Sequence, residues 1–193
     1  MAAVQLVAGL GNPGNKYEQT RHNAGFWFVD EVARRCGTHF TADNRHKSEV
    51  ARCTLHGHDC RLQKPQAFMN CSGGPVAALA RFYQIPRNAI LVVHDELDLP
   101  AGTVRLKKDG GHGGHNGLRD LIPQLGGNDF LRLRIGIGHP GHKDDVTGHV
   151  LKPATAEERR LIDQAIDAAI GVLPRILAGD IEAAMKALHT KPG

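Results

Sequence analysis

A chain of 193 residues, 41% hydrophobic and 23% charged, can bury a sizeable core, and its ordinary composition excludes a disordered, fibrous or low-complexity protein. Lys and Arg outnumber Asp and Glu by 24 to 20, an excess that favours an anionic partner without identifying it. No apolar segment approaches the ~20 residues that cross a bilayer, and no signal peptide is recognisable, so we expect a cytoplasmic protein that does not enter a membrane.

The four cysteines, Cys36, Cys53, Cys60 and Cys71, form no C-x-x-C pair and no zinc-ligand spacing. Free thiols in a reducing compartment are therefore the prediction. The twelve histidines contain no H-x-x-x-H or H-E-x-x-H pair, so no metal site is expected either.

The first predicted strand, Val4 to Leu10, runs into a G-x-G-x-x-G pattern, the fingerprint of a dinucleotide site. Pro13 interrupts the phosphate turn, however, and no helix opens at Gly14. The helix is predicted to begin after Asn23, a good N-cap residue, and to stop at Gly37. We therefore reject a dinucleotide-dependent oxidoreductase and expect no cofactor.

Polar side chains gather before that helix. Asn12 lies in the tight turn, Tyr17 follows, and His22 and Asn23 stand at the helix mouth. A histidine at the positive end of a helix dipole is held neutral and can act as a base near pH 7. His22 is accordingly a catalytic candidate.

Two further strands, Lys47–Leu55 and Cys60–Gln63, are joined by a hairpin-like turn and lead towards a second helix. Phe68 and Met69 in this connection would by themselves be core residues. Asn70 is harder to assign to packing, because a buried amide needs several hydrogen-bond partners.

The apolar run Ala89–Val93 is typical of a central strand covered on both faces. It ends in His94, Asp95 and Glu96. Functional groups gather at the carboxyl ends of strands in open α/β sheets, so Asp95 is well placed for chemistry.

A basic strand with Arg105 and Lys107 opens into the glycine-rich segment Gly110–Gly117, and helix-forming residues follow from Leu118. Glycine permits positive φ and close approach to a ligand, so this segment is predicted to be a mobile loop at a site, with Asn116 as a hydrogen-bonding group within it.

The run Leu131–Gly138 alternates between apolar and polar residues, which predicts a strand with one buried face. Arg132 and Arg134 lie on the other face, either solvated or poised for phosphate. Helices are predicted at Thr155–Val172 and Asp180–Leu188, followed by a loose tail.

Five motifs run along the chain: GLGNPG-x-x-Y-x-x-T-R-H-N-A-G-F, F-M-N-x-S-G, V-x-H-D-E-L-D-L-P-x-G, G-G-H-G-G-H-N-G-L-R-D and F-x-R-L-R-I-G-I-G-H-P-G. In this order and spacing, from Leu6 to about Leu151, they resemble the bacterial peptidyl-tRNA hydrolases. The resemblance implies a monomeric, single-domain α/β protein spanning residues 1–193, with a mixed twisted β-sheet flanked by helices on both faces. It also implies cleavage of the ester that joins a peptide to the 3′ ribose of tRNA, with peptidyl-tRNA as the partner.

The resemblance assigns roles to residues that match the motifs. His22 matches the catalytic histidine and Asp95 its partner, while Asn12, Asn70 and Asn116 match the asparagines that position substrate and water. Tyr17 matches a residue near the 3′-terminal nucleotide. The residues matching the peptide side of the cleft and its gate are Phe68, Met69, Gly113 and His115, and we add Asn23 at the helix mouth to the substrate-binding set.

The same resemblance predicts basic groups for the tRNA phosphates at Lys107, Arg132 and Lys143. Where the family often has two lysines this chain has Arg105 and then Lys107, which leaves open which of the two meets phosphate. An ester hydrolase needs a base, an activated water and donors for the oxyanion. His22, Asp95 and the asparagines supply these groups, and no G-x-S-x-G elbow indicates a serine nucleophile. A non-catalytic tRNA-binding module of the same fold remains the alternative.

Overall fold

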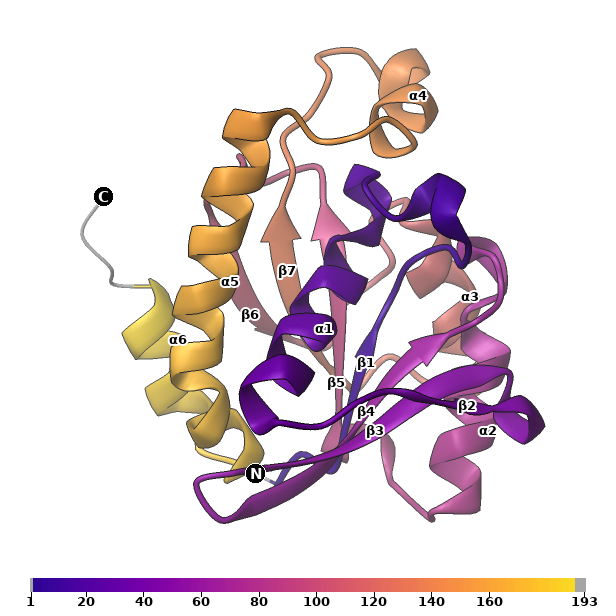
Figure 1. The fold of residues 1–193 in the computed structure, drawn as a ribbon, viewed down its shortest axis with the longest axis vertical. Coiled ribbons are helices and arrows are strands. Elements are labelled where there is room, and N and C mark those ends of the chain that lie inside the picture. The colour runs from indigo at the N-terminus through magenta and orange to yellow at the C-terminus, as the bar shows by residue number, and fades with distance from the viewer. Residues whose placement is uncertain (1, 190–193) are drawn as a thin grey trace.

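The computed structural model describes residues 2–189, so residues 190–193 of the expected loose tail His189–Gly193 lie outside the described residues, and the prediction is wrong for His189, which ends the helix Ile181–His189. Its centre is one seven-stranded sheet with the strand order β2-β3-β4-β1-β5-β7-β6 (Figure 1). The strands are β1 (Leu6–Gly9), β2 (Thr41–Asp43), β3 (Ser48–Leu55), β4 (His58–Pro65), β5 (Ile90–Glu96), β6 (Val104–Lys108) and β7 (Leu131–Gly136).

The sheet is mixed. Its four central strands, β4, β1, β5 and β7, run parallel to one another, so their carboxyl ends share one edge. The outer strands pair antiparallel, β6 with β7 and the β2–β3 ribbon with β4. The predicted mixed α/β architecture is confirmed, and the carboxyl edge is where the site must be sought.

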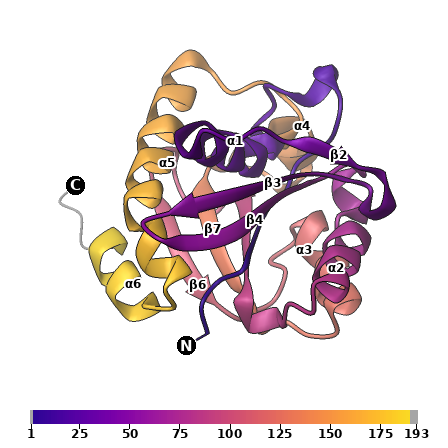
Figure 2. The same cartoon turned by 60° about the horizontal axis from the view of Figure 1, so that its bottom comes forward.

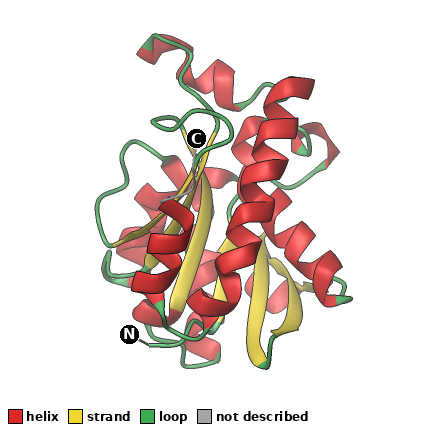
Figure 3. Ribbon diagram, turned by 90° about the vertical axis from the view of Figure 1, so that its left-hand side faces the viewer, coloured by secondary structure: helices red, strands yellow, loops and turns green. Residues whose placement is uncertain are grey.

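Helices cover both faces of the sheet, as Figure 2 shows from below. On one face lie α1 (Ala24–Cys36) and the long α5 (Ala156–Leu177), which runs alongside the strands in Figure 3, with α6 (Ile181–His189) packed beside α5 and β6. On the other face lie α2 (Gly73–Phe82) and α3 (Asn116–Leu125). The short α4 (Val146–Val150) stands beyond the carboxyl edge (Figure 1). No helix within residues 2–189 combines the length and apolarity needed to cross a membrane.

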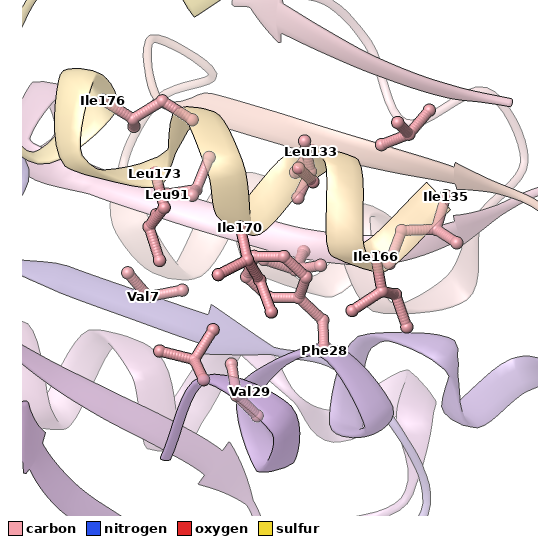
Figure 4. Packing of buried hydrophobic residues seen from close by; sticks show 14 of the residues in the cluster. Val7, Phe28, Val29, Leu91, Leu133, Ile135, Ile166, Ile170, Leu173 and Ile176 are labelled. Atoms are coloured by element: carbon pink, nitrogen blue, oxygen red, sulfur yellow. The ribbon is translucent and has the colours of Figure 1, made fainter. Parts of the chain in front are cut away.

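Two apolar cores lie on the two faces of the sheet. The core under α1 and α5 is fully buried and brings together side chains from both helices and the central strands (Figure 4). Those labelled in the figure are Val7, Phe28, Val29, Leu91, Leu133, Ile135, Ile166, Ile170, Leu173 and Ile176. The smaller core under α2 and α3 includes Leu6, Ala8, Val92 and Leu121. Burial of both faces explains why β1 and β5 are apolar without alternation.

Local signals predicted most element boundaries well. Gly37 ends α1 in the left-handed conformation, with φ of 69°, as the sequence predicted. Thr155 and Glu158 form a complete capping box at the start of α5, which continues five residues past the predicted end at Val172. In the hairpin, the turn is only His56 and Gly57, because the residues that follow already pair in β4.

The prediction of four free thiols is wrong for two of them. Cys36 at the end of α1 and Cys53 in β3 form a disulfide, with Cα atoms 5.7 Å apart, whereas Cys60 and Cys71 are free. No local spacing marks this pair, because the two cysteines meet only when α1 packs across the sheet. Burial, with the nearby charge of Asp59, raises the pKa of the Cys60 thiol to about 12.

Candidate active site

A cleft of about 260 Å³ opens at the carboxyl edge of the sheet. The chain segments that follow β1, β4 and β5 meet there, together with the amino end of α3 and one side of α4. Ten of the predicted catalytic and substrate-binding residues line it: Asn12, Tyr17, His22, Phe68, Met69, Asn70, Asp95, Gly113, His115 and Asn116. Segments separated by more than a hundred residues in the chain are therefore brought to one site.

His22 and Asp95 form a buried pair within this cleft. His22 lies in the 3₁₀ turn Arg21–Asn23 just before α1, and its Nδ1 is 2.8 Å from Oδ2 of Asp95 at the end of β5. A carboxylate only accepts hydrogen bonds, so Nδ1 of His22 carries the proton and Nε2 is the free base.

The electrostatics of the pair differ from the sequence-based expectation. Burial by itself would lower the pKa of His22, but the charge of Asp95 and the hydrogen bond to it raise that pKa above 6.5 overall. The negative partner therefore outweighs the effect of burial on the pKa of His22. Burial works against ionisation of Asp95 as well, yet His22 and His115 hold the pKa of its carboxyl far below the usual range.

His115 occupies the second oxygen of Asp95, with Nε2 2.8 Å from Oδ1. Its Nδ1 accepts hydrogen bonds from the backbone N–H groups of Gly117 and Leu118 and so caps α3. These contacts fix the Nε2–H tautomer, because Nδ1 needs its lone pair for the cap. The sequence placed His115 at the gate of the cleft but gave no sign that it contacts Asp95.

His94 lies beneath the pair and is fully buried. Its Nδ1–H donates to the carbonyl oxygen of Asp95 at 2.8 Å, and Nε2 has no hydrogen-bond partner within residues 2–189. Burial, reinforced by the charge of His115, lowers the pKa of His94 to about 4. His94 is thus neutral and helps to fix the backbone that carries Asp95.

His22, Asp95 and His115 are also the one group in the described part of the chain whose ligand atoms are close enough to hold a metal ion. The hydrogen bonds oppose that use. A metal on Nε2 of His115 would require a proton on Nδ1, facing the two backbone N–H groups that now donate to it. The trio fits a hydrogen-bonded acid–base centre better than a metal centre.

Asn12 is held in one orientation by two neighbours. The side-chain carboxamide of Asn23 makes two hydrogen bonds to the backbone of Asn12. Its Oδ1 accepts from the Asn12 N–H at 2.9 Å, and its Nδ2 donates to the Asn12 carbonyl oxygen at 3.0 Å. The side-chain Oδ1 of Asn12 accepts from the N–H of Met69 at 2.6 Å. The Nδ2 group of Asn12 is consequently left to donate towards the cleft. Asn23 stands behind Asn12 and does not line the cleft, and its side chain does not cap α1.

The outer part of the cleft is partly apolar. Phe68 is 60% exposed, which excludes the alternative of a core position and fits a residue of the cleft, and its ring lies edge-on to Tyr17 with centroids 6.2 Å apart. Met69 is buried as expected. Asn70 is exposed at the rim, which agrees with the expectation that it is not a packing residue. Asn116 is exposed too, and its Oδ1 accepts from Arg119.

The short helix α4 forms one wall of the cleft, which the sequence analysis did not predict. Val146, Val150 and Leu151 line the cleft at helical spacing, a pattern that could have marked a short amphipathic helix. Arg21, next to His22 in the chain, connects α4 to the segment that carries His22. Its guanidinium donates to the carbonyl oxygen of His149 at 2.9 Å and pairs with Glu158 at 2.8 Å.

The predicted phosphate-binding residues lie outside the cleft. The register of β6 and β7 places Arg105 opposite Arg134 and Lys107 opposite Arg132. Like charges directly opposite each other disfavour pairing of the strands, so these four residues are not explained by the pairing of β6 with β7.

Arg132 does not fit its predicted phosphate contact. It is only 1% exposed, and its guanidinium donates to the carbonyl oxygens of Gly110, Gly111 and Asn128. Arg132 therefore anchors the glycine-rich loop from inside. Arg134 donates from Nε to the Glu96 carboxylate at 2.9 Å and keeps part of its side chain exposed, and Lys143 is exposed in the turn before α4.

The fold and this centre together define a class of protein. A histidine oriented by a buried carboxylate, at the carboxyl edge of an α/β sheet and open to a cleft, is the arrangement with which hydrolases perform general-base catalysis.

Comparison with known proteins identifies the family within that class. The family model of peptidyl-tRNA hydrolase matches residues 6–193. The peptidyl-tRNA hydrolase of Halorhodospira halophila is 55% identical over 185 residues, covering 96% of this chain and 95% of the relative, and that of Pseudomonas aeruginosa is 55% identical over 192 residues, covering 99% of both. The crystal structure of the Acinetobacter baumannii peptidyl-tRNA hydrolase superposes with a TM-score of 0.95 at 48% identity, covering 98% of this chain and 96% of that one. The chain belongs to the peptidyl-tRNA hydrolase family and is a hydrolase.

Proposed function

We propose that this enzyme cleaves the ester bond between the peptide and the 3′-terminal ribose of peptidyl-tRNA, and so recycles tRNA from prematurely released peptidyl-tRNA. The observation that carries the proposal is the His22–Asp95 pair, which opens on a cleft with amide donors on one side and apolar side chains on the other. We expect the enzyme to act as a monomer in the cytoplasm.

His22 is the general base. Its free Nε2 takes a proton from a water molecule while the water oxygen attacks the ester carbonyl carbon. Asp95 holds the ring in the Nδ1–H tautomer and stabilises the imidazolium that forms, as in a catalytic triad that lacks its serine. The proton then passes to the departing 3′ oxygen of the ribose, which leaves tRNA and a free peptide acid.

Amide groups surround the reacting ester. Oδ1 of Asn12 accepts a hydrogen bond from the N–H of Met69, which leaves Nδ2 of Asn12 directed into the cleft. Nδ2 can therefore donate to the water or to the oxyanion. Asn23 keeps Asn12 in place as a positioning residue. We assign Asn116 to the ester side and Asn70 to the peptide backbone, since both are exposed and line the cleft.

The two ends of the substrate need different surfaces. Phe68 and Met69, with the α4 wall, offer apolar contact to the peptide, and Tyr17 lies against Phe68 where the 3′-terminal nucleotide would enter. Gly113 has φ of 57° with open space around it, so the loop can move there as a gate. His115 holds the inner end of that gate to Asp95.

The phosphates of tRNA bind to the basic row on β6 and β7 and to Lys143 near the cleft. Arg105 and Lys107 come from the predicted set, and the strand register adds Arg134. Phosphate contacts of this kind fix the position of the nucleic acid and contribute affinity that falls with salt, without reading sequence.

The test is hydrolysis of an N-acetyl-aminoacyl-tRNA, with a chelator present, by the wild type, His22→Ala and the control His58→Ala from the distant β3–β4 hairpin. Loss of the general base should lower kcat by ~10²–10⁴-fold, while the control keeps its activity. Substantial turnover by His22→Ala would refute the assignment. Binding of the substrate without turnover by the wild type would favour the non-catalytic tRNA-binding module.

A further inference from the structure

Two arginines that do not line the catalytic cleft face each other on the sheet. Arg52 in β3 and Arg61 in β4 are directly opposite in the antiparallel register. Like charges in this position destabilise a sheet. Neither guanidinium has a hydrogen bond or an ion pair with any residue in the described range 2–189, so nothing there neutralises the pair.

The two arginines line a pocket of about 250 Å³ together with His39 and Tyr83. Its floor is apolar and includes Val50 and Leu79, and none of its lining residues is acidic. The guanidinium of Arg61 lies 3.6 Å from the centroid of the Tyr83 ring, a stacking distance. The pocket thus combines concentrated positive charge with a planar aromatic wall.

Exposed aromatic side chains extend this wall. The large apolar residues that are exposed in the described chain are Phe68, Leu151, Phe82 and Tyr83. Phe68 and Leu151 belong to the catalytic cleft, whereas Tyr83 lines this pocket and Phe82 packs against Tyr83 from outside it, with the two rings at 87° and 4.8 Å between centroids. The site is separate from the cleft, because α2 starts at Gly73 beside the cleft and its ten residues span about 15 Å before Tyr83.

We propose that this pocket is a second nucleotide-binding site. The phosphate binds Arg52 and Arg61, and the base stacks on the Tyr83–Arg61 layer, since guanidinium and aromatic planes both accept a stacked base. The ligand is a nucleotide, either free or as one unit of an RNA strand that reaches past the end of α2. This assignment goes beyond the hydrolytic reaction and does not depend on it.

A local reporter tests the site directly. The chain contains a single tryptophan, Trp27, which is buried, so Tyr83→Trp adds a second fluorophore at the pocket while keeping an aromatic wall. Its fluorescence is titrated with 5′-AMP, a six-nucleotide RNA and inorganic phosphate, and the signal of the wild type is subtracted. We expect AMP or the RNA to quench the fluorescence in a saturable way, with binding that weakens as salt is added. The midpoints of the two titrations show whether the site prefers a free nucleotide or an RNA strand.

The same titration in Tyr83→Trp with Arg52→Gln and Arg61→Gln should require roughly tenfold or more ligand. Adding Arg175→Gln instead, an exposed arginine on α5, removes the same charge elsewhere and should leave the midpoint unchanged. An unchanged midpoint in the double arginine variant would overturn the proposal, as would the absence of quenching by either nucleotide ligand. Phosphate that binds as tightly as AMP would overturn the role of the aromatic wall.

Thermal unfolding provides an independent readout. A pair of arginines that binds a ligand contributes repulsion, not stability, to the free protein. Tm of the Arg52→Gln/Arg61→Gln variant should therefore be equal to or above that of the wild type. A lower Tm would show a structural role and contradict the proposal. Hydrolysis of N-acetyl-aminoacyl-tRNA by His22 should persist in this variant, so failure here is distinguishable from failure of the proposed reaction.

Discussion

The two carboxylate oxygens of Asp95 accept hydrogen bonds from two different histidines, His22 and His115, and these bonds set the charge of the site. Burial of a carboxylate is costly, yet two N–H donors at 2.8 Å keep it ionised. The retained negative charge raises the pKa of His22 above 6.5 although burial opposes this. The proposed general-base role of His22 needs its neutral form, so the acid limb of the rate profile should lie above pH 6.5.

Asp95→Asn should therefore change both the rate and its pH dependence. The neutral amide no longer stabilises imidazolium, so kcat should fall by ~10²–10⁴-fold. The pKa of His22 should drop, which moves the acid limb of kcat/KM to lower pH. The control is Asp98→Asn, an exposed acid just beyond the same strand. An acid limb at the wild-type pH in Asp95→Asn would contradict the assigned origin of the shift.

At the scale of elements, the packing of α1 against the sheet brings His22 to Asp95. A Cβ on Gly25 would overlap the carbonyl oxygen of Val93 and come within 2.6 Å of the backbone of Leu10. The first turn of α1 thus lies directly on the carboxyl ends of β1 and β5. His22, three residues before Gly25, is positioned by this contact.

Gly25→Ala should accordingly force α1 away from the sheet. We expect a loss of at least 1–3 kcal/mol in the free energy of unfolding, the usual cost of overpacking, and a fall in kcat larger than the change in KM. The matched control is Gly171→Ala in α5, where an added Cβ has open space. That change should stabilise the protein by roughly 0.5–1 kcal/mol through helix propensity. Equal effects at the two sites, measured by urea unfolding, would refute the close-contact argument.

The glycine-rich loop is held at both ends and free between them. Arg132 anchors Gly110 and Gly111 through their carbonyl oxygens, and His115 fastens the other end to Asp95 and to α3. Gly113 and Gly114 have no neighbour within 4 Å of an added Cβ in the described structure. Arg132 thus holds one end of this loop in position.

Arg132→Lys tests this structural role against a phosphate role. A lysine cannot serve three carbonyl oxygens, so the free energy of unfolding should fall by roughly 1–3 kcal/mol. The salt dependence of tRNA binding should stay at the wild-type slope, since the charge is kept and is buried. Arg175→Lys on the surface should change stability by less than ~0.5 kcal/mol. A flattened salt slope with unchanged stability would restore the phosphate role of Arg132.

At the scale of the whole molecule, the modest formal net charge of +4 conceals an uneven distribution. The basic row on β6 and β7 lies at one end of the sheet and the Arg52–Arg61 pair towards the other. Local fields of one sign, more than net charge, attract a polyanion and set its orientation.

Binding of uncharged tRNA over a series of salt concentrations should report the β6–β7 surface. Lys107→Ala and Arg134→Gln should each weaken binding to all tRNAs and reduce the slope of log K against log salt by about 1. Arg34→Gln, an exposed arginine on α1 paired with Glu31, is the control and should leave the slope unchanged. Wild-type slopes in both test variants would exclude this surface as the tRNA contact.

The sequence by itself determined the elements and the strand ends that carry the site. Periodicity, caps and glycine stops are local signals, so α1, α5 and the central strand β5 were predicted close to their observed bounds. The strand end marked Asp95 as well placed for chemistry, whereas the grouping of Asn12, His22 and Asp95 was implied by the resemblance to the family.

Only the tertiary structure decided which groups contact one another across that edge. Three of these contacts join separate segments of the chain: the hydrogen bond between His115 and Asp95, the hydrogen bonds between Asn23 and Asn12, and the Cys36–Cys53 disulfide. The burial of Arg132 likewise depends on a segment other than its own strand. Such contacts depend on strand register and on how closely helices approach the sheet. No local pattern encodes either quantity, because both result from packing of the whole core.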